Sequence, residues 1–481
     1  MKRNTVWIST AISILFPLLS AEAQDVDVPG NLTMVSSIDA TTGNVLKDGV
    51  PFLHNFGTNN TFLGSNAGNM LMSGAGNTAT GSQALFNNDT GNNNTASGYQ
   101  ALFSNTTGNF NNAFGWSALQ SNTTGSFNTA SGPSALQFNA TGNYNTANGN
   151  EALRLNTAGH FNTAAGYQAL LANTGNWNTA NGAGALQHNI SGPSNTASGF
   201  LALQNNSTGG DNTATGSNAL QNNTTGDFNA ASGFFVLQAN TTGTANTASG
   251  SFALRSNTTG GYNSASGYYA LSNNTTGNSN TATGSSALVS NSTGRNNTAI
   301  GVGALVANTT GSYNTAIGAS AGTPMDNLIN TTAIGYGAVV NASNKIRLGD
   351  NNVTVIEGQV PYTFTSDRNK KENFQPIEGE EVLTRIRGLS LTSWNYIGQD
   401  SKQFRHYGPM AQDFFAAFGH DAYGTIGTPT TITSGDLDGI LMVAAQALEQ
   451  RTVEQEREIA ALRAENADIA ARLAALERRA R

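Results

Sequence analysis

A repeat of 17 residues dominates this sequence and constrains its fold more than any other feature. Each unit follows the pattern N-T-A-x-G-x-x-A-L-x-x-N-T-T-G-x-x, and one unit is shorter by a single residue. Self-similarity at a fixed period is the signature of a solenoid, in which every unit is one structural element stacked on the next. The leucine of the pattern recurs at positions 85, 102, 119, 136, 153, 170, 186, 203, 220, 237, 254, 271, 288 and 305.

The residue types of the unit favour a β coil. The N-T-T-G segment resists helix formation, because its side chains compete for backbone hydrogen bonds and glycine adds backbone entropy. The T-A-x-G segment favours a short extended piece followed by a turn. We therefore predict one β coil per unit over residues 77–330, with coils stacked about 4.8 Å apart.

The apolar content of one unit is low. It offers an interior only Ala, Leu and an occasional Ile, Phe or Val, which is little area to set against the entropy of ordering 17 residues. We therefore expect several chains to share the interior. The predicted fold class is mainly β: a repetitive, trimeric β-roll or β-solenoid shaft, followed by an α+β module and a trimeric coiled coil.

Charged residues are rare along the repeats, which argues against catalysis there. No acid pair, metal-binding cluster or general base recurs, so we expect no cofactor and no metal. The lack of paired carboxylates also argues against a glycan-degrading enzyme. The net charge of −7 and the lack of a basic stripe argue against nucleic acid as a partner. Between residues 77 and 320 the charged residues are Asp89, Glu151, Arg154, Asp211, Asp227, Arg255 and Arg295.

Three aromatic residues, Phe110, Phe127 and Tyr144, occupy the same phase of successive units. Such a ladder is compatible with stacking against the sugar rings of a glycan. Aromatic residues at one phase also stack on one another in adjacent coils whatever the function of the chain. Both interpretations remain open at this stage.

The amino terminus is typical of a secretory signal peptide over residues 1–23. Basic residues at Lys2 and Arg3 precede an apolar stretch from Val6 to Leu19, and Ala21-Glu22-Ala23 forms a small-x-small cleavage site. The alternative, a membrane anchor, needs roughly 20 apolar residues. We expect a secreted or cell-surface protein with no transmembrane span after the signal is removed, beginning with a lead-in over residues 24–76.

The repeat pattern decays after residue 330. Residues 344–350 and 353–356 alternate as a strand pair would, which predicts a β neck over residues 331–365. From residue 366 to 440 the composition becomes that of a globular α+β module. Its predicted core aromatics are Trp394, Tyr396, Phe404, Tyr407, Phe414, Phe415 and Phe418.

The tail, residues 441–481, carries a heptad pattern that predicts a coiled coil. The polar Asn466 lies in this seam, where it either fixes the register and number of chains or binds a ligand; the first role is the common one. One heptad phase holds Leu441, Leu448, Gln455, Leu462, Ile469 and Leu476, and its partner phase holds Ala445, Thr452, Ile459, Asn466, Leu473 and Ala480.

Two resemblances to known families add to these patterns. The segment Ala299-Ile300-Gly301-Val302-Gly303-Ala304 resembles the head repeats of trimeric autotransporter adhesins, although the unit here is longer and their membrane anchor is missing. Residues 366 to about 450 resemble the endosialidase-type intramolecular chaperone autoproteases of phage tail spikes and fibres, serine peptidase family 74. This second likeness rests on Ser366-Asp367, Lys371-Glu372-Asn373, Ser393-Trp394-Asn395-Tyr396, Gly408-Pro409-Met410-Ala411-Gln412 and the stretch from Asp436 to Leu448.

The second resemblance implies a catalytic pair. In that family the first Ser of the motif is the nucleophile and the Lys five residues later is the base, which here are Ser366 and Lys371, so that the bond cut is Thr365-Ser366. A serine hydroxyl is a weak nucleophile, and a lysine whose pKa is lowered by desolvation can remove its proton at neutral pH. Residues five apart on a continuous helix point about 140° apart, so the two side chains meet only if a turn intervenes.

Several alternatives accompany this interpretation. Lys370 competes with Lys371 as the base, Ser366 could merely cap a helix that begins near Arg368, and His406 is more typical of a structural than of a catalytic histidine. We expect an exported homotrimeric fibre whose C-terminal chaperone registers the chains and then cuts itself off. The alternative is a structural adhesin with an uncut, inactive module. The expected partners are further copies of this chain and a cell-surface or glycan receptor.

Overall fold

The structure is a computed structural model that describes residues 44–47, 49–353, 356, 366–397, 399–421 and 424–480. The chain divides into two units, residues 1–356 and 357–481. The predicted signal peptide, most of the predicted lead-in before residue 44, and Thr365 of the predicted cleavage site lie outside the described residues.

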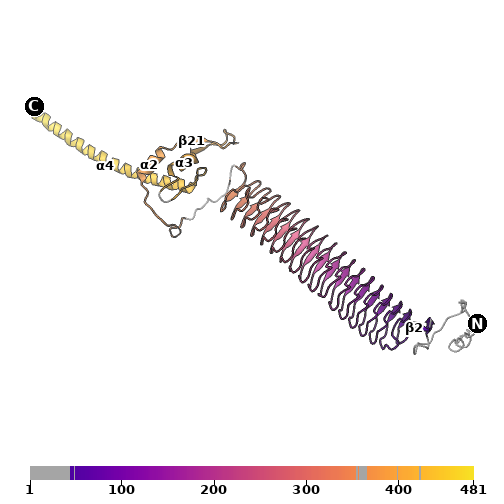
Figure 1. The fold of residues 1–481 in the computed structure, drawn as a ribbon. Coiled ribbons are helices and arrows are strands. Elements are labelled where there is room, and N and C mark those ends of the chain that lie inside the picture. The colour runs from indigo at the N-terminus through magenta and orange to yellow at the C-terminus, as the bar shows by residue number, and fades with distance from the viewer. Residues whose placement is uncertain are drawn as a thin grey trace, which may run out of the picture. The chain divides into compact units, whose positions relative to one another are not determined.

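The first unit is a β-solenoid, which confirms the fold predicted from the repeat. Figure 1 shows its coils stacked side by side along one axis. Each coil contributes one three-residue strand that pairs in parallel with the strands of the neighbouring coils. Equivalent positions of the repeat lie opposite one another, so that Ala282 pairs with Ala265 on one side and with Ala299 on the other.

The strands of the solenoid have the following bounds: β3 (Thr61–Leu63), β4 (Thr78–Thr80), β5 (Thr95–Ser97), β6 (Asn112–Phe114), β7 (Thr129–Ser131), β8 (Thr146–Asn148), β9 (Thr163–Ala165), β10 (Thr179–Asn181), β11 (Thr196–Ser198), β12 (Thr213–Thr215), β13 (Ala230–Ser232), β14 (Thr247–Ser249), β15 (Ser264–Ser266), β16 (Thr281–Thr283), β17 (Thr298–Ile300), β18 (Thr315–Ile317), β19 (Thr332–Ile334) and β20 (Ile346–Leu348).

The interior of the solenoid is closed by a single chain. Its apolar part comes from the central Ala of each strand and from the Ala-Leu pair of the following turn, as in Ala282, Ala287 and Leu288. Two columns of Asn, represented by Asn280 and Asn291, are buried alongside them. The prediction that several chains share the interior is therefore wrong, because buried Asn side chains add to the apolar ones in filling it.

The buried Asn columns are amide ladders that run from coil to coil. Asn223 donates through Nδ2 to Oδ1 of Asn206 (2.7 Å) and to the carbonyl of Gly226 (2.9 Å), and its own Oδ1 accepts from Nδ2 of Asn240 (2.8 Å). A buried amide is costly unless its donors and acceptors are paired. Because every coil places an Asn at the same point, each amide finds its partner in the next coil, and the ladder stabilises the stack.

Backbone geometry explains why glycine follows each strand. Gly284 has φ +131°, and a Cβ built there would lie 2.5 Å from the carbonyl oxygen of Gly301 in the next coil. The buried Leu of each coil also has positive φ, for example 50° at Leu288. This left-handed conformation costs an L-residue about 1–2 kcal/mol. Full burial of a leucine side chain offsets that cost, since it contributes roughly 1.5–3 kcal/mol.

Both ends of the solenoid depart from the regular coil. At the start, β1 (Val45–Lys47) and β2 (Val50–His54) pair antiparallel, and β2 also pairs antiparallel with β3. His54 is buried against Phe62, and burial lowers the pKa of its imidazole. Such caps prevent the exposed edge of the first coil from pairing with another sheet.

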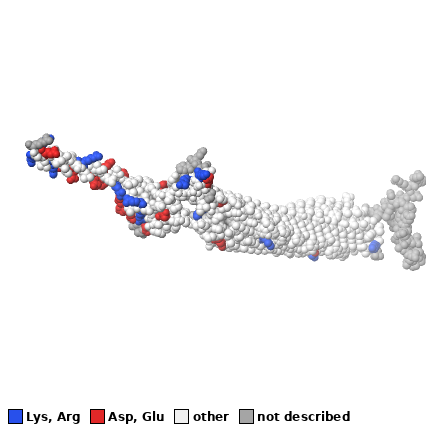
Figure 2. Space-filling model, turned by 90° about the horizontal axis from the view of Figure 1, so that it is seen from above, with Lys and Arg blue, Asp and Glu red and all other residues white. Residues whose placement is uncertain are grey.

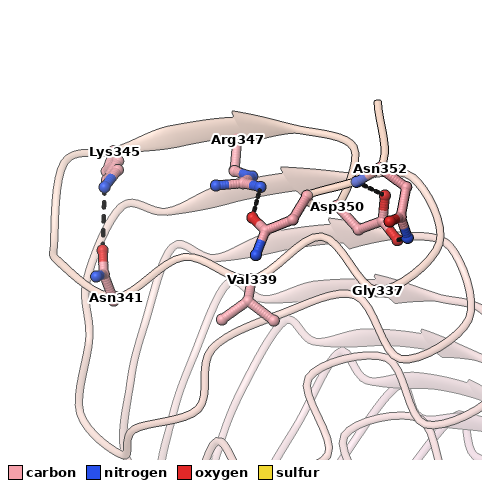
Figure 3. A pocket seen from close by; sticks show the side chains of 8 residues that line it. Gly337, Val339, Asn341, Lys345, Arg347, Asp350 and Asn352 are labelled. Carbon is pink, nitrogen blue, oxygen red and sulfur yellow. Dashed lines mark hydrogen bonds between the residues drawn. The ribbon is translucent and has the colours of Figure 1, made fainter. Parts of the chain in front are cut away.

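The last coil ends in a polar cap. Strand β20 pairs in parallel with β19, and Arg347 occupies the place of the inward-pointing Ala. Its guanidinium donates to Oδ1 of Asn351 (2.7 Å), and Lys345 donates to Asn341 (3.0 Å), around a hollow of about 460 Å³ (Figure 3). The first strand of the predicted neck pair is thus the last strand of the solenoid. The second, over residues 353–356, lies partly outside the described residues.

The second unit combines helices with one hairpin. Its elements are the 3₁₀ helix η1 (Arg368–Lys370), α2 (Gly379–Arg387), β21 (Leu391–Trp394), β22 (His406–Pro409), α3 (Ala411–Phe418) and α4 (Ser434–Ala480). A small core forms where Val382, Phe414, Phe418 and Ala444 meet. Phe414 and Phe418 are core residues as predicted, whereas the predicted core residues Tyr396 and Tyr407 are exposed, because the two-stranded hairpin that carries them is too small to cover them.

The charges of the chain gather in this second unit. Figure 2 shows few charged side chains on the face of the shaft in view, and many on the C-terminal helix and the module. Within the described part of the chain, no helix combines the length and apolarity needed to cross a bilayer.

Candidate functional site at the start of the C-terminal unit

The side chains of Ser366 and Lys371 meet in the structure. Nζ of Lys371 lies 2.7 Å from Oγ of Ser366 and donates a hydrogen bond to it. Both residues are exposed. The pair predicted from the motif is therefore within the distance at which a proton can pass between a hydroxyl and an amine.

A single turn of 3₁₀ helix brings the two side chains together. Helix η1 occupies residues 368–370, and the backbone N–H of Lys371 closes the turn on the carbonyl of Arg368 (3.2 Å). Residues five apart face the same side across this turn, whereas a continuous α-helix would separate them. Among the described residues it is Lys371, and not the competing Lys370, that reaches the serine.

The cap of this turn is Asp367. Its carboxylate accepts a hydrogen bond from the backbone N–H of Asn369 (2.9 Å). Ser366 does not cap η1, so its hydroxyl is left to accept from Lys371. Sequence reasoning named Ser366 as the possible cap and not Asp367, although Asp is as good a capping residue as Ser.

Neighbouring side chains steady the turn without entering the pair. The guanidinium of Arg368 lies over the ring of Phe374, 5.4 Å from its centre. Asn373 has φ +58°, a left-handed conformation that asparagine tolerates well, and it directs the chain away after the turn. The contact between Arg368 and Phe374 thus links the turn to the segment that follows it.

His406 lies in the hairpin, among aromatic rings. Its ring stacks on Trp394 (centroids 4.6 Å apart), and Tyr396 packs edge-on against both rings. This placement fits the structural role expected for His406. Two atoms of this cluster, Nε2 of His406 and Nε1 of Trp394, are buried without a hydrogen-bond partner among the described residues. Buried polar atoms are nearly always paired, so these two atoms are exceptions within the described part of the chain.

The shaft carries the predicted aromatic ladder. Phe110, Phe127, Tyr144, Phe161 and Trp177 follow one another in successive coils, with ring centroids 4.9–6.3 Å apart and planes within 10° of parallel. Each inner ring therefore has a neighbouring ring on both faces. Stacking between adjacent coils accounts for this ladder, and a sugar would meet mainly ring edges along it.

Within the described residues no group of three or more His, Asp and Glu side chains could hold a metal ion. The charged residues at the end of the solenoid, Lys345, Arg347 and Asp350, are each hydrogen-bonded to asparagines or to the backbone.

Comparison with known families supports the resemblance of the C-terminal unit. Residues 366–421 match the peptidase S74 family, described as the chaperone of endosialidase. The match begins at Ser366 and includes the turn, α2, the hairpin and α3. A comparison with curated proteins gave no match. Residues 366–421 are therefore similar to the chaperone of endosialidase, and their position after a β-solenoid shaft is consistent with a tail-fibre-like protein.

Proposed function

We propose that this chain is an exported, trimeric fibre whose C-terminal domain gathers three chains and then cuts itself from the shaft between Thr365 and Ser366. The observation that carries the proposal is the hydrogen bond between Lys371 and Ser366 at the first residue of the matched domain. The shaft supplies the fibre, and the domain supplies assembly and release.

The cleavage follows from the roles assigned to the two side chains. Oγ of Ser366 attacks the carbonyl carbon of Thr365 while Nζ of Lys371, in its neutral form, takes the hydroxyl proton. The C–N bond breaks as that proton passes to the nitrogen of Ser366, which leaves Thr365 esterified to Oγ. Water then hydrolyses the ester, giving a carboxylate on Thr365 and restoring the hydroxyl of Ser366. The reaction consumes one water and needs no cofactor.

Trimer formation is supported by the open seam of helix α4. The predicted heptad positions along the helix, among them Leu448, Leu462 and Ile469, are all exposed, at about half of their full accessibility. A different face of the helix, at Ala444 and Ala447, packs within the module. A 47-residue helix with an uncovered apolar seam is stabilised by pairing with copies of itself.

A second uncovered surface lies in the last coils of the shaft. The outward position at the end of each strand holds Ser, Thr, Asn or Ala in most coils, but Ile300, Ile317, Ile334 and Leu348 in the last four. All four side chains are exposed. This apolar column is confined to the last four coils, so copies of the chain can meet there while the strand ends of the earlier coils stay uncovered.

Because each shaft closes its own interior, the alignment that needs help is that of the three shafts with one another, and not that of the coils within one chain. Strand slippage inside one solenoid would require a whole unit to loop out, so a single chain needs little help to stack its own coils. Because successive coils are nearly identical, however, three shafts can align with an offset of one coil at almost no cost in contacts. The domain is then required to start all three shafts at the same level.

Substitution of the pair tests the cleavage. Ser366→Ala and Lys371→Ala should each abolish the release of the 116-residue fragment 366–481, because one removes the nucleophile and the other the base. Lys370→Ala is the matched control and should be cut normally. Denaturing gels and N-terminal sequencing of the fragment follow the reaction, and the association state of uncut protein should stay trimeric.

Two outcomes would redirect the proposal. If Lys370→Ala abolished cleavage and Lys371→Ala did not, Lys370 would be the base and the assignment of Lys371 would be wrong. A parent protein that keeps its full mass after assembly would favour the second candidate function, a structural adhesin with an uncut chaperone domain, which the exposure of both Ser366 and Lys371 in the isolated chain also accommodates.

A further inference from the structure

One column of the shaft alternates between large aromatic and small side chains. It consists of the residue directly after the strand glycine in each coil. From coil to coil it runs Tyr167, Ala183, Phe200, Ser217, Phe234, Ser251, Tyr268. The four aromatic residues are between 45% and 56% exposed, so each ring presents a large part of its surface to solvent.

Packing does not impose this alternation. In earlier coils the same column holds Tyr99 and Trp116 in direct succession, and both are exposed to a similar degree. Adjacent coils thus accept two bulky rings at this position. The interposed Ala183, Ser217 and Ser251 keep the later rings two coils apart, which is about 9.6 Å for a coil spacing of about 4.8 Å.

The rings of this column do not stack face to face on one another along the shaft. Phe234 stands at 89° to the neighbouring Phe235, and Tyr268 stands at 84° to Tyr269. Phe235, Phe252 and Tyr269 instead form their own parallel stack beneath them, with planes within 14° of one another. Phe234 and Tyr268 therefore differ from the ladder that begins at Phe110, in which inner rings cover each other on both faces.

A polar column accompanies the aromatic one. Two residues before each ring or small residue lies the last strand position, which points outward. It carries a hydroxyl or an amide in every coil of this stretch except at Ala165, as in Asn181, Thr215 and Ser249. Over residues 167–283 the charged residues are Asp211, Asp227 and Arg255, and none of them belongs to either column. The surface offers flat apolar rings and neutral hydrogen-bonding groups, and it lacks the cations that a polyanion would require.

We propose that this surface binds a neutral, extended β-1,4-linked glycan that runs along the shaft. In such a chain each sugar is flipped relative to the last, so the same ring face recurs at every second sugar. The disaccharide repeat matches the two-coil separation of the aromatic rings, so Tyr167, Phe200, Phe234 and Tyr268 can each stack on the equivalent sugar. The hydroxyls of the neighbouring column hydrogen-bond the sugar hydroxyls between the rings.

Binding to insoluble polysaccharides tests this proposal. The full chain should sediment with microcrystalline cellulose or with chitin, both β-1,4-linked, and should ignore granular starch, whose α-linked chains coil. The combined variant Phe200→Ala, Phe234→Ala, Tyr268→Ala should bind at least about tenfold more weakly. The matched control Phe110→Ala, Phe127→Ala, Tyr144→Ala removes equally exposed rings and should bind within about twofold of the parent. Thermal melting of each variant verifies that the solenoid is intact.

A second variant examines the spacing itself. Ser251→Phe inserts a ring between Phe234 and Tyr268, which would cover faces that the glycan needs, and binding should fall although the surface becomes more aromatic. Unchanged or stronger binding by Ser251→Phe, equal losses in the two triple variants, or no sedimentation of the parent with either β-linked polymer would each overturn the proposal. These assays do not depend on the Ser366 cleavage, so failure of one proposal is distinguishable from failure of the other.

Discussion

The shaft and the C-terminal unit solve the problem of covering apolar surface in opposite ways. In the shaft every coil buries its Ala, Leu and Asn completely within one chain. Among the described residues of the C-terminal unit, a few around Val382 and Phe414 are buried, and apolar residues line an uncovered face of α4. The comparison indicates that the shaft closes its interior within one chain, whereas the C-terminal unit leaves apolar surface uncovered.

The largest effect on the shaft is expected from a charge in the amide ladder. Asn223→Asp removes the donor that bonds Asn206 and Gly226 and places a carboxylate in a fully buried column. An uncompensated buried charge costs about 3–5 kcal/mol. We expect the urea midpoint of the shaft to fall sharply and hydrogen exchange to rise in the coils on both sides.

The neighbouring Asn222 provides the control for this substitution. Its Oδ1 accepts from Asn205 (3.0 Å) on a half-buried surface, and Asp keeps that acceptor. Asn222→Asp should change stability by less than about 0.5 kcal/mol. Equal effects of the two variants would show that the ladder does not stabilise the stack.

A smaller effect is expected from the glycine that follows the strand. Gly284→Ala places a methyl group 2.5 Å from the carbonyl oxygen of Gly301, at a φ that only glycine adopts easily, and should cost about 2 kcal/mol or more. Gly303→Ala is the counterpart, because its φ is +64° and no atom lies within 4 Å of the added carbon. That change should cost about 1 kcal/mol. Thermal melting compares the two variants. A larger loss of stability in Gly303→Ala than in Gly284→Ala would contradict the stacking geometry.

The smallest effect on the shaft is expected from the coiled-coil seam. Leu462→Ser together with Ile469→Ser should dissociate the trimer, as followed by analytical ultracentrifugation, while the melting of the assembled and released shaft stays the same. Arg463→Ser, which lies outside the seam on the same exposed helix, should leave association intact. A trimer that survives the double substitution would place the contacts between chains elsewhere, for example at Ile317 and its neighbours.

The periodic features of the fold could be predicted from the sequence, whereas the burial of polar side chains could not. The Leu column and the parallel coils follow from spacing, because a repeat fixes which residues recur together. The pairing of Ser366 with Lys371 comes from the family resemblance, and their spacing adds that a turn must separate them. The buried position of Asn223 and its equivalents was not foreseen, since asparagine is usually a turn or surface residue. It becomes an interior residue only when the next coil supplies an identical partner, which is a property of the stack.

The same limit applies to the C-terminal unit. An aromatic residue such as Tyr407 is typical of a core, yet no described part of the chain covers it. The exposed pair Ser366 and Lys371 lies close enough to exchange a proton, but its catalytic role remains a proposal for the cleavage assay. The alternating column at Phe234 was visible in the sequence, where comparing every second repeat would have revealed it.

The short coil between β9 and β10 has a consequence for how this gene can change. Thr163 pairs with Thr179 across 16 residues, and Asn162 still bonds the next Asn of its ladder, because the missing residue is absorbed in the turn at Asn173-Thr174-Gly175. Strands and ladders therefore tolerate variation that falls in this turn, and the loss or duplication of a whole unit leaves every column aligned between the same two caps. Recombination between the repeats would lengthen or shorten the shaft in steps of one coil, so related chains should carry shafts of different length with the same ends.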